Sequence, residues 1–192
     1  MSIQEVLSLC LFVLFVITVL IRAAILRKRG IQAIVFGKTD KSDFIIIPVV
    51  AVVVYAVLAS MFELPIWEVL IRPFGGNLIS GWMGIVLCSV ALVGFILSMY
   101  NFGDSFRVGI DEHTPNMLIT SGVFAFSRNP IYVCFLIFVA GLFLIHRNIV
   151  IAVATLFFAL IIHRQILREE RFLKAHYGEE YAAYCKKVRR YL

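Results

Sequence analysis

Charged side chains are scarce in this chain of 192 residues: only 16% of the residues are charged, and 61% are hydrophobic. Soluble domains average about 25% charged and about 45–50% apolar residues. One small core cannot bury such an excess of apolar surface, so the composition excludes an ordinary soluble globular domain. The mean hydropathy of +0.95 instead indicates that lipid solvates much of the chain.

Sequence patterns that mark nucleotide and metal sites are also missing. The chain has no Walker loop and no G-x-G-x-x-G run, and its four histidines lack metal-ligand spacing, so we expect no metal site. The four cysteines lie far apart without a C-x-x-C pair, which is typical of small buried apolar residues. The first apolar run follows Glu5 rather than a basic segment, so we expect it to remain as a membrane helix.

What the chain does contain is a series of uncharged apolar runs, over residues 6–21, 44–62, 78–100, 131–145 and 148–162. A membrane crossing needs about 20 residues, and the first three runs meet this need, the first by continuing past Arg22 to Leu26. The last two are short and separated only by His146 and Arg147, which predicts a tight hairpin. We therefore predict an all-α integral membrane protein with about five transmembrane helices, the last two a helical hairpin.

The positive charge is concentrated in segments that share one side of the membrane. Residues 27–43, 101–130 and 164–192 hold most of the 18 Lys and Arg residues, whereas the opposite side has only Arg72 and Arg147. Cytoplasmic loops carry an excess of these residues. We therefore predict an inner-membrane protein whose N-terminus is outside and whose C-terminus is cytoplasmic. Its expected partner is the lipid bilayer, and we expect no nucleic acid.

The basic tail divides at Gly178. Residues 149–176 are predicted to form one long helix that leaves the membrane, and residues 179–192 a second helix. In the second helix Tyr181, Tyr184 and Tyr191 fall at helical spacing among lysines and arginines. This pattern favours a C-terminal amphipathic cytoplasmic helix at the level of the lipid headgroups, with a solvated basic tail as the alternative.

Three polar segments converge on the cytoplasmic side, over residues 118–124, 127–132 and 164–170. Pro130 suits a first helical turn, because its missing N–H is not needed there, and this places Asn129 near the N-cap. The N–H groups of such a turn can hold a carboxylate or another anion, although the same residues also fit an ordinary N-cap. Arg128 likewise fits either a ligand or a phosphate headgroup.

An acidic pair, Glu169 and Glu170, directly follows an apolar helix. Paired acids close to a bilayer are costly without partners, which Arg164, Arg168 and Arg171 are near enough to supply. The pair therefore indicates either a functional site or a solvated charged face.

Two stretches resemble a known family. They are L-I-T-S-G-V-F-x-F-S-R-N-P-I-Y from Leu118, and E-E-R-F-L-x-x-x-Y-G-E-E-Y-x-x-Y from Glu169. Their order and spacing are similar to those of the isoprenylcysteine carboxyl methyltransferase family, which is related to membrane phospholipid methyltransferases. The resemblance implies that residues 101–192 form a cofactor-binding half for S-adenosylmethionine. The apolar runs in residues 1–100 predict three further helices of the same single membrane domain. The resemblance implies methyl transfer to a lipophilic small molecule or a lipidated acceptor.

The resemblance also implies roles for individual residues. Glu169 and Glu170 match an acidic pair, one member of which takes the amino group of the cofactor, and we expect this member to be Glu169. Arg164 lies near an arginine linked to the acceptor. Glu170 or His163 would act as the base for an amine acceptor, so Arg164 and Glu170 are the candidate catalytic residues. The other matches to cofactor-binding positions are Asn116, Met117, Leu118, Ile119, Phe124, Asn129, Pro130, Ile131 and Tyr132.

Three of these positions depart from the family pattern, which has His where this chain has Asn116 and Asn129, and Tyr where it has Phe124. An Asn amide can replace one imidazole N–H donor, whereas Phe cannot donate a hydrogen bond. The departures concern the acceptor more than the cofactor, and they argue against assuming a prenylcysteine carboxylate. Two alternatives remain, a sterol-reductase-like oxidoreductase that uses NADPH and a non-catalytic membrane scaffold.

Overall fold

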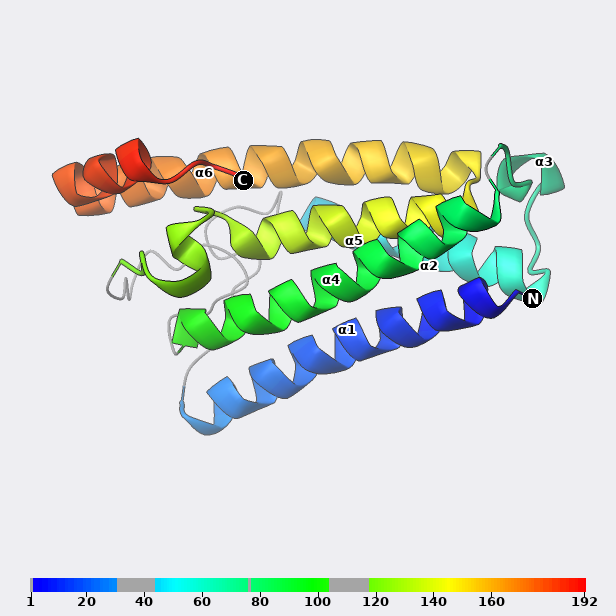
Figure 1. Ribbon diagram of the computed structural model, residues 1–192, viewed down its shortest axis with the longest axis horizontal. Helices are drawn as coiled ribbons and strands as arrows, with labels where there is room; N and C mark the ends of the chain where they lie inside the picture. The colour runs from blue at the N-terminus through cyan, green and yellow to red at the C-terminus, as the bar shows by residue number, and fades with distance from the viewer. Residues whose placement is uncertain (1, 31–43, 76, 104–117) are drawn as a thin grey trace.

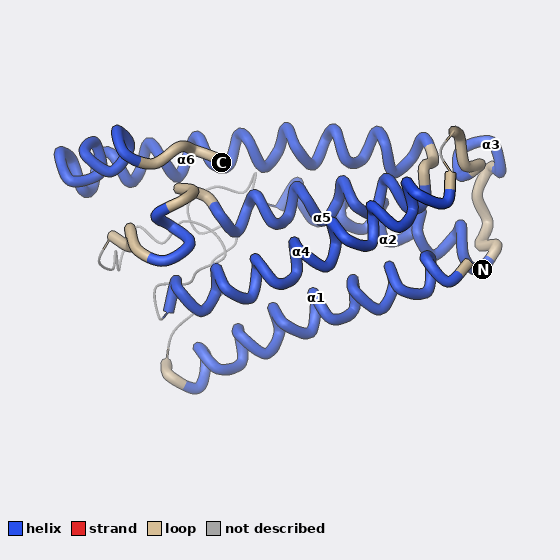
Figure 2. Tube along the Cα trace, in the orientation of Figure 1, coloured by secondary structure: helices blue, strands red, loops and turns tan. Residues whose placement is uncertain are grey.

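A computed structural model describes residues 2–30, 44–75, 77–103 and 118–192, and in these ranges the chain is helical without strands (Figure 1, Figure 2). The long helices run along one another in a bundle. Their bounds are α1 Ile3–Lys28, α2 Ile46–Phe62, α4 Leu78–Phe102, α5 Pro130–His146 and α6 Ile149–Lys187. A single helical turn, α3 (Glu68–Ile71), and a 3-10 turn, η3 (Gly122–Ala125), lie in the connections.

Successive helices alternate in direction, so the bundle has two distinct ends. At the end where α1 begins, the Gln4 amide donates to the Leu78 carbonyl at 3.1 Å, and the Phe74 N–H donates to the Arg147 carbonyl at 2.9 Å. At the opposite end, Arg22 donates to the carbonyl of Gly103, the residue that ends α4. The last turns of α1 and the end of α4, which lead into two of the basic segments, therefore lie at the same end of the structure.

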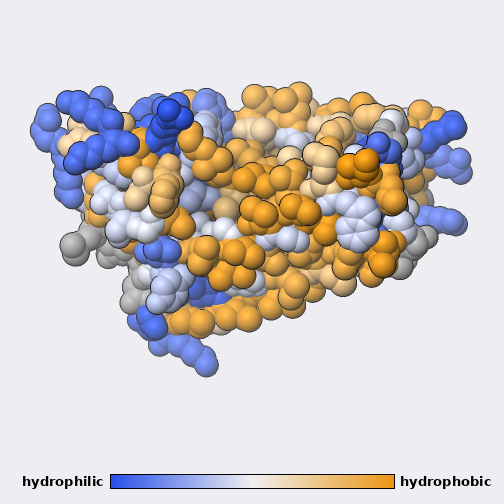
Figure 3. Space-filling model, viewed as in Figure 1, coloured by the Kyte–Doolittle hydropathy of each residue, from blue (hydrophilic) through white to orange (hydrophobic). Residues whose placement is uncertain are grey.

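The proportions of the helices fit a bilayer. α1, α4 and α6 are long and apolar enough to cross one, and α2 and α5 are apolar helices of 17 residues each. At 1.5 Å per residue such a helix spans about 25 Å, against a hydrocarbon core of about 30 Å. On the face shown in Figure 3 the middle is apolar, and hydrophilic residues gather at the end where α6 extends beyond the other helices. The predicted all-α integral membrane fold is confirmed, as is the hairpin, since only Arg147 and Asn148 separate α5 from α6.

The α4–α5 pair packs more closely than side chains would allow. A Cβ added at Gly84 would lie 2.6 Å from the Gly141 carbonyl oxygen, and one added at Gly141 would lie 2.6 Å from Cys88 Sγ. Small residues bring membrane helices together in this way, because packing rather than the hydrophobic effect drives their association. The α4–α5 pair has the most extensive contact in the bundle. α1 packs mainly on α4, and α2 packs mainly on α6.

A buried polar cluster joins three helices at the end where α1 begins. His146, the last residue of α5, lies 3.1 Å from Ser8 Oγ of α1 and 3.1 Å from Ser60 Oγ of α2. Each serine hydroxyl also lies 2.8 Å from a carbonyl oxygen of its own helix. Buried polar groups stabilise a structure only when they are satisfied. The cluster therefore fixes α1 and α2 to one point on α5.

The end of the chain differs from the predicted helix over residues 179–192. The predicted division at Gly178 is present as a kink, with φ 49° and ψ −119°, a conformation that glycine adopts readily. The helix then ends at Lys187, and Val188 is extended. Tyr181 and Tyr184 are buried, because this segment turns back onto the protein and the Tyr184 hydroxyl donates to the Phe124 carbonyl at 2.6 Å. Placing these two tyrosines among the lipid headgroups was therefore wrong.

Candidate functional site

The start of α5 is held by the last residues of the chain. Pro130 begins the helix as predicted, and Asn129 is its N-cap residue but makes no side-chain cap bond. Instead, Asn129 Nδ2 donates to the Arg190 carbonyl at 3.1 Å, and the Arg128 N–H donates to the Arg189 carbonyl at 3.0 Å. The N–H groups of the first turn are therefore not taken up by the N-cap side chain, and such groups attract anions.

Tyr132 and Glu169 join this first turn to α6. The Tyr132 hydroxyl donates to Glu169 Oε1, and Gln165, one turn earlier in α6, donates to the same oxygen at 3.2 Å. Two polar segments that the sequence places far apart are thus in contact. Their juxtaposition sets a carboxylate beside a helix N-terminus, an arrangement that offers opposite partial charges to a zwitterionic ligand. That Glu169 binds a cofactor stays a prediction.

Glu170, the second acid of the pair, has different surroundings. Its Oε2 accepts from Nε and Nη2 of Arg190 at 3.0 and 2.8 Å, and its Oε1 lies 3.2 Å from Nη2 of Arg128. The side chain of Glu170 is only 11% exposed. The hydrogen bond to this carboxylate raises the pKa of Arg190. The two acids therefore differ: Glu169 contacts α5, whereas Glu170 holds two arginines.

The 118–124 segment is only partly described. Asn116 and Met117, predicted to lie along a cofactor, fall outside the described residues. Leu118 and Ile119 are half-buried. Phe124 is buried in η3, and its ring packs on Phe102 of α4 with the centroids 5.0 Å apart. The described contacts of Phe124 therefore link η3 to the bundle.

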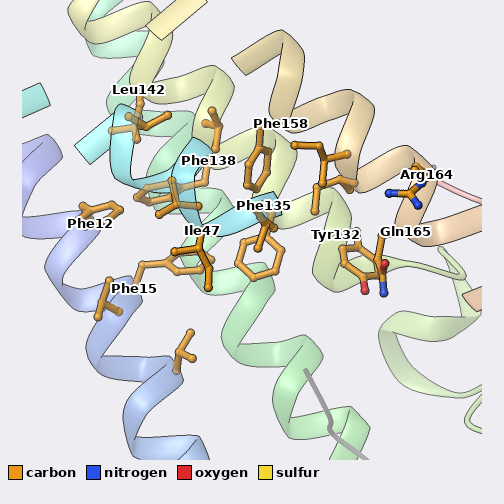
Figure 4. Close-up of a pocket in the computed structure, with 18 of the residues that line it drawn as sticks. Phe12, Phe15, Ile47, Tyr132, Phe135, Phe138, Leu142, Phe158, Arg164 and Gln165 are labelled. Carbon is orange, nitrogen blue, oxygen red and sulfur yellow. The ribbon is translucent and has the colours of Figure 1, made fainter. Parts of the chain in front are cut away.

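An apolar cavity of about 420 Å³ lies between α1, α2, α5 and α6, within the range typical of small-molecule sites. Aromatic rings form much of its wall, including Phe12, Phe15, Phe135, Phe138 and Phe158 (Figure 4).

The cavity is polar at one end. There Arg164, Gln165 and Arg168 of α6 join Tyr132 of α5 in its lining, and Figure 4 shows Arg164, Gln165 and Tyr132 gathered on one side of it. Tyr132 also donates to Glu169. The polar end of the cavity, called its mouth below, therefore adjoins the contact between α5 and α6. Arg164, a predicted site residue, is therefore at the boundary between the apolar cavity and the polar site.

The sequence pattern did not reveal two groups of residues near this site. The first is the part of the cavity wall from α1 and α2, where apolar residues facing a cavity look like those facing lipid. The second is Arg190 and Tyr191, which it assigned to a surface helix. The signal that could have revealed Arg190 is its charge, which is opposite to that of the acidic pair Glu169 and Glu170.

Comparison with known proteins identifies one family and two proteins that are similar to this chain in sequence. A family model described as phospholipid methyltransferase matches residues 79–180. The chain is 33% identical over 97 residues to a protein-S-isoprenylcysteine O-methyltransferase of Schizosaccharomyces pombe, an alignment covering 47% of this chain and 40% of that protein. It is 31% identical over 132 residues to the cobalt-zinc-cadmium resistance protein CzcN of Cupriavidus metallidurans, covering 64% of this chain and 60% of that protein.

These alignments span 40% and 60% of the two relatives, which is less than two thirds of either. The family match covers more than half of the chain and contains the α5 start, Tyr132 and Glu169, whereas α1 and α2 lie outside it. The chain therefore belongs to the phospholipid methyltransferase family, as an isoprenylcysteine methyltransferase-like member.

Proposed function

We propose that the protein transfers a methyl group from S-adenosylmethionine to a lipophilic acceptor dissolved in the membrane. The observation that carries this proposal is the apolar cavity of about 420 Å³ whose polar mouth adjoins the Tyr132–Glu169 contact. Such a site brings an apolar chain and a polar cofactor together at the edge of the bilayer. Family membership supports the same reaction.

The α5 start suits the amino-acid part of S-adenosylmethionine. Glu169 would accept hydrogen bonds from the amino group. The first turn of α5 would hold the carboxylate together with Arg128, whose buried Nε has no hydrogen-bond partner among the described residues. The cofactor supplies an activated methyl group, so the protein has to align the reactants and exclude water.

The acceptor chain would occupy the cavity and enter from the bilayer. Val16 and Leu20 of α1 and Ile47 and Val50 of α2 line the cavity and are also exposed on the surface, so the cavity opens toward lipid between these helices. An apolar cavity of about 150 Å³ holds benzene. By that scale, a cavity of about 420 Å³ has room for about 17 carbon atoms.

The acceptor group that we propose is a carboxylate. Arg164 and Arg168 line the mouth, where guanidinium groups attract an anion and repel a protonated amine. A carboxylate attacks a methyl group without first losing a proton, so it needs no general base. Arg164 would orient the acceptor. Glu170, predicted as a base for an amine, would position Arg128 and Arg190, with which it is paired.

A titration and a product assay test the proposal. We expect the detergent-purified protein to bind S-adenosylmethionine and S-adenosylhomocysteine in calorimetry, and not NADPH. With methyl-labelled S-adenosylmethionine and membrane lipids, we expect label in a lipid product that mild base releases as methanol, as an ester requires. Binding of NADPH alone would favour the oxidoreductase, and binding of none of the three would favour the scaffold. Base-stable label would show methylation of nitrogen rather than oxygen.

The same proposal places the mouth of the cavity on the cytoplasmic side, where S-adenosylmethionine is made available. In a chain with its four cysteines replaced, we expect Ser2→Cys to react with a membrane-impermeant maleimide in intact cells. Glu179→Cys, beyond the kink of α6, is expected to react only after lysis. The basic residues at the α6 exit are the reason, because cytoplasmic segments retain such charge. The reverse labelling pattern would invert the topology.

A further inference from the structure

The last five residues, 188–192, lie beyond the end of α6 and form a segment called the C-terminal strap below. It begins where α6 ends at Lys187, with Val188 at φ −123° and ψ 135°. The chain has turned back at the kink, and it ends beside α6 (Figure 1). The C-terminal strap therefore lies against the part of α6 that carries the acidic pair.

The backbone of the C-terminal strap is joined to the residues that lead into α5. The Arg189 carbonyl accepts from the Arg128 N–H at 3.0 Å. The Arg190 carbonyl accepts from Asn129 Nδ2 at 3.1 Å and from Ser127 Oγ at 3.5 Å. Three consecutive residues before Pro130 are thus held by two consecutive carbonyls.

The side chains of the C-terminal strap reach α6 instead. Arg190 donates to Glu170 Oε2 through Nε at 3.0 Å and through Nη2 at 2.8 Å. The Tyr191 hydroxyl lies 2.5 Å from Nδ1 of His163, and Tyr191 packs on a buried cluster that includes Ile162. Because Val139, Phe158 and Ile162 of this cluster also line the cavity, Tyr191 packs on residues that form part of the cavity wall.

We propose that Arg190 and Tyr191 are positioning residues for methyl transfer, because the C-terminal strap locks the start of α5 to α6. Arg190 bridges the two elements, with its carbonyl bound to Asn129 and its guanidinium bound to Glu170. Because Glu170 is adjacent to Glu169 in α6, this bridge fixes the position of Glu169 relative to Tyr132, its hydrogen-bond partner. The inference rests on the proposed function, since it concerns the placement of the same cofactor-binding residues.

The test compares Arg190→Ala and Tyr191→Ala with Lys187→Ala in the full-length, detergent-purified protein. Lys187 is exposed, carries the same charge as Arg190 and precedes the C-terminal strap. We expect Arg190→Ala to weaken S-adenosylmethionine binding by about tenfold or more, the scale of a lost charge-assisted hydrogen bond. Amide hydrogen exchange over residues 127–133 should accelerate in Arg190→Ala and Tyr191→Ala, and Arg190→Lys should restore part of the affinity. Lys187→Ala should match the wild type in both measurements.

A double-mutant cycle shows whether Arg190 acts through Glu170. Glu170→Gln and the double variant with Arg190→Ala should lose similar affinity, because both break one bridge. Normal S-adenosylmethionine affinity in Arg190→Ala would overturn the inference, whether or not amide exchange accelerates. If the wild type binds no S-adenosylmethionine, the proposed function and this inference both fail. Binding by the wild type with no effect of either alanine variant overturns the inference alone.

Discussion

Replacing Glu169 with glutamine is expected to weaken S-adenosylmethionine binding by about 10- to 100-fold without unfolding the protein. The Glu169 carboxylate accepts from the Tyr132 hydroxyl and from Gln165, and glutamine keeps its size but removes its charge. Hydrogen bonds to charged groups contribute about 1.5–3 kcal/mol, and about 1.4 kcal/mol corresponds to a tenfold change in Kd. Calorimetric titration of the purified variant measures the loss.

Two further variants make this result specific. Tyr132→Phe removes only the hydroxyl that orients Glu169, so a smaller loss of about tenfold is expected. Glu179→Gln removes the same charge from an exposed position beyond the kink and should bind normally. Wild-type affinity in both Glu169→Gln and Tyr132→Phe would place the cofactor elsewhere in the protein.

Substituting tryptophan for Ile47 is expected to reduce methyl transfer to lipid by about tenfold or more, a scale set by changes in apolar substrate pockets. Ile47 lines the cavity but is 52% exposed. The indole would therefore fill the opening between α1 and α2 instead of overpacking a core. S-adenosylmethionine binding should be unchanged, because Ile47 is not part of the Tyr132–Glu169 contact. Incorporation of labelled methyl groups into extracted lipid, with calorimetry in parallel, measures the two effects.

Ile96→Trp is the matched control for this substitution. Ile96 is also exposed on an apolar helix, at 45%, but it lies on α4 and does not line the cavity. Its variant should retain full methyl transfer. Equal losses in the two variants would point to a general effect of tryptophan on the membrane fold, and full activity in Ile47→Trp would remove the opening between α1 and α2 as the route of the acceptor.

The meeting of α5 and α6 was predictable from the sequence for a simple reason. Pro130 marks where one apolar helix begins, and Glu169 marks where the next one leaves the bilayer. Because the two helices are joined at their far ends by a two-residue connection, these positions must lie on the same side. Their direct contact through Tyr132 adds a detail that spacing alone does not give.

Neither the cavity nor the position of the C-terminal strap could be predicted from the sequence in this way. Phe15 and Ile47 are apolar residues in membrane helices, and nothing in their chemistry distinguishes a cavity wall from a lipid-facing surface. Tyr181, Tyr184 and Tyr191 have helical spacing, which was interpreted as one amphipathic helix. The kink at Gly178 turns this segment back onto the protein, so that two of these tyrosines are buried and Tyr191 leaves the helix altogether.

Two pairs of helices line the cavity, and they differ in whether the family match includes them. α5 and the part of α6 that lines the cavity lie within the segment that matches the family, whereas α1 and α2 lie outside it. Under the proposed function, substitutions in α1 and α2 could change which lipid is accepted while the methyl donor stays the same. Exchanging these two helices between homologous proteins should then redirect such an enzyme to new lipids, with its chemistry left intact.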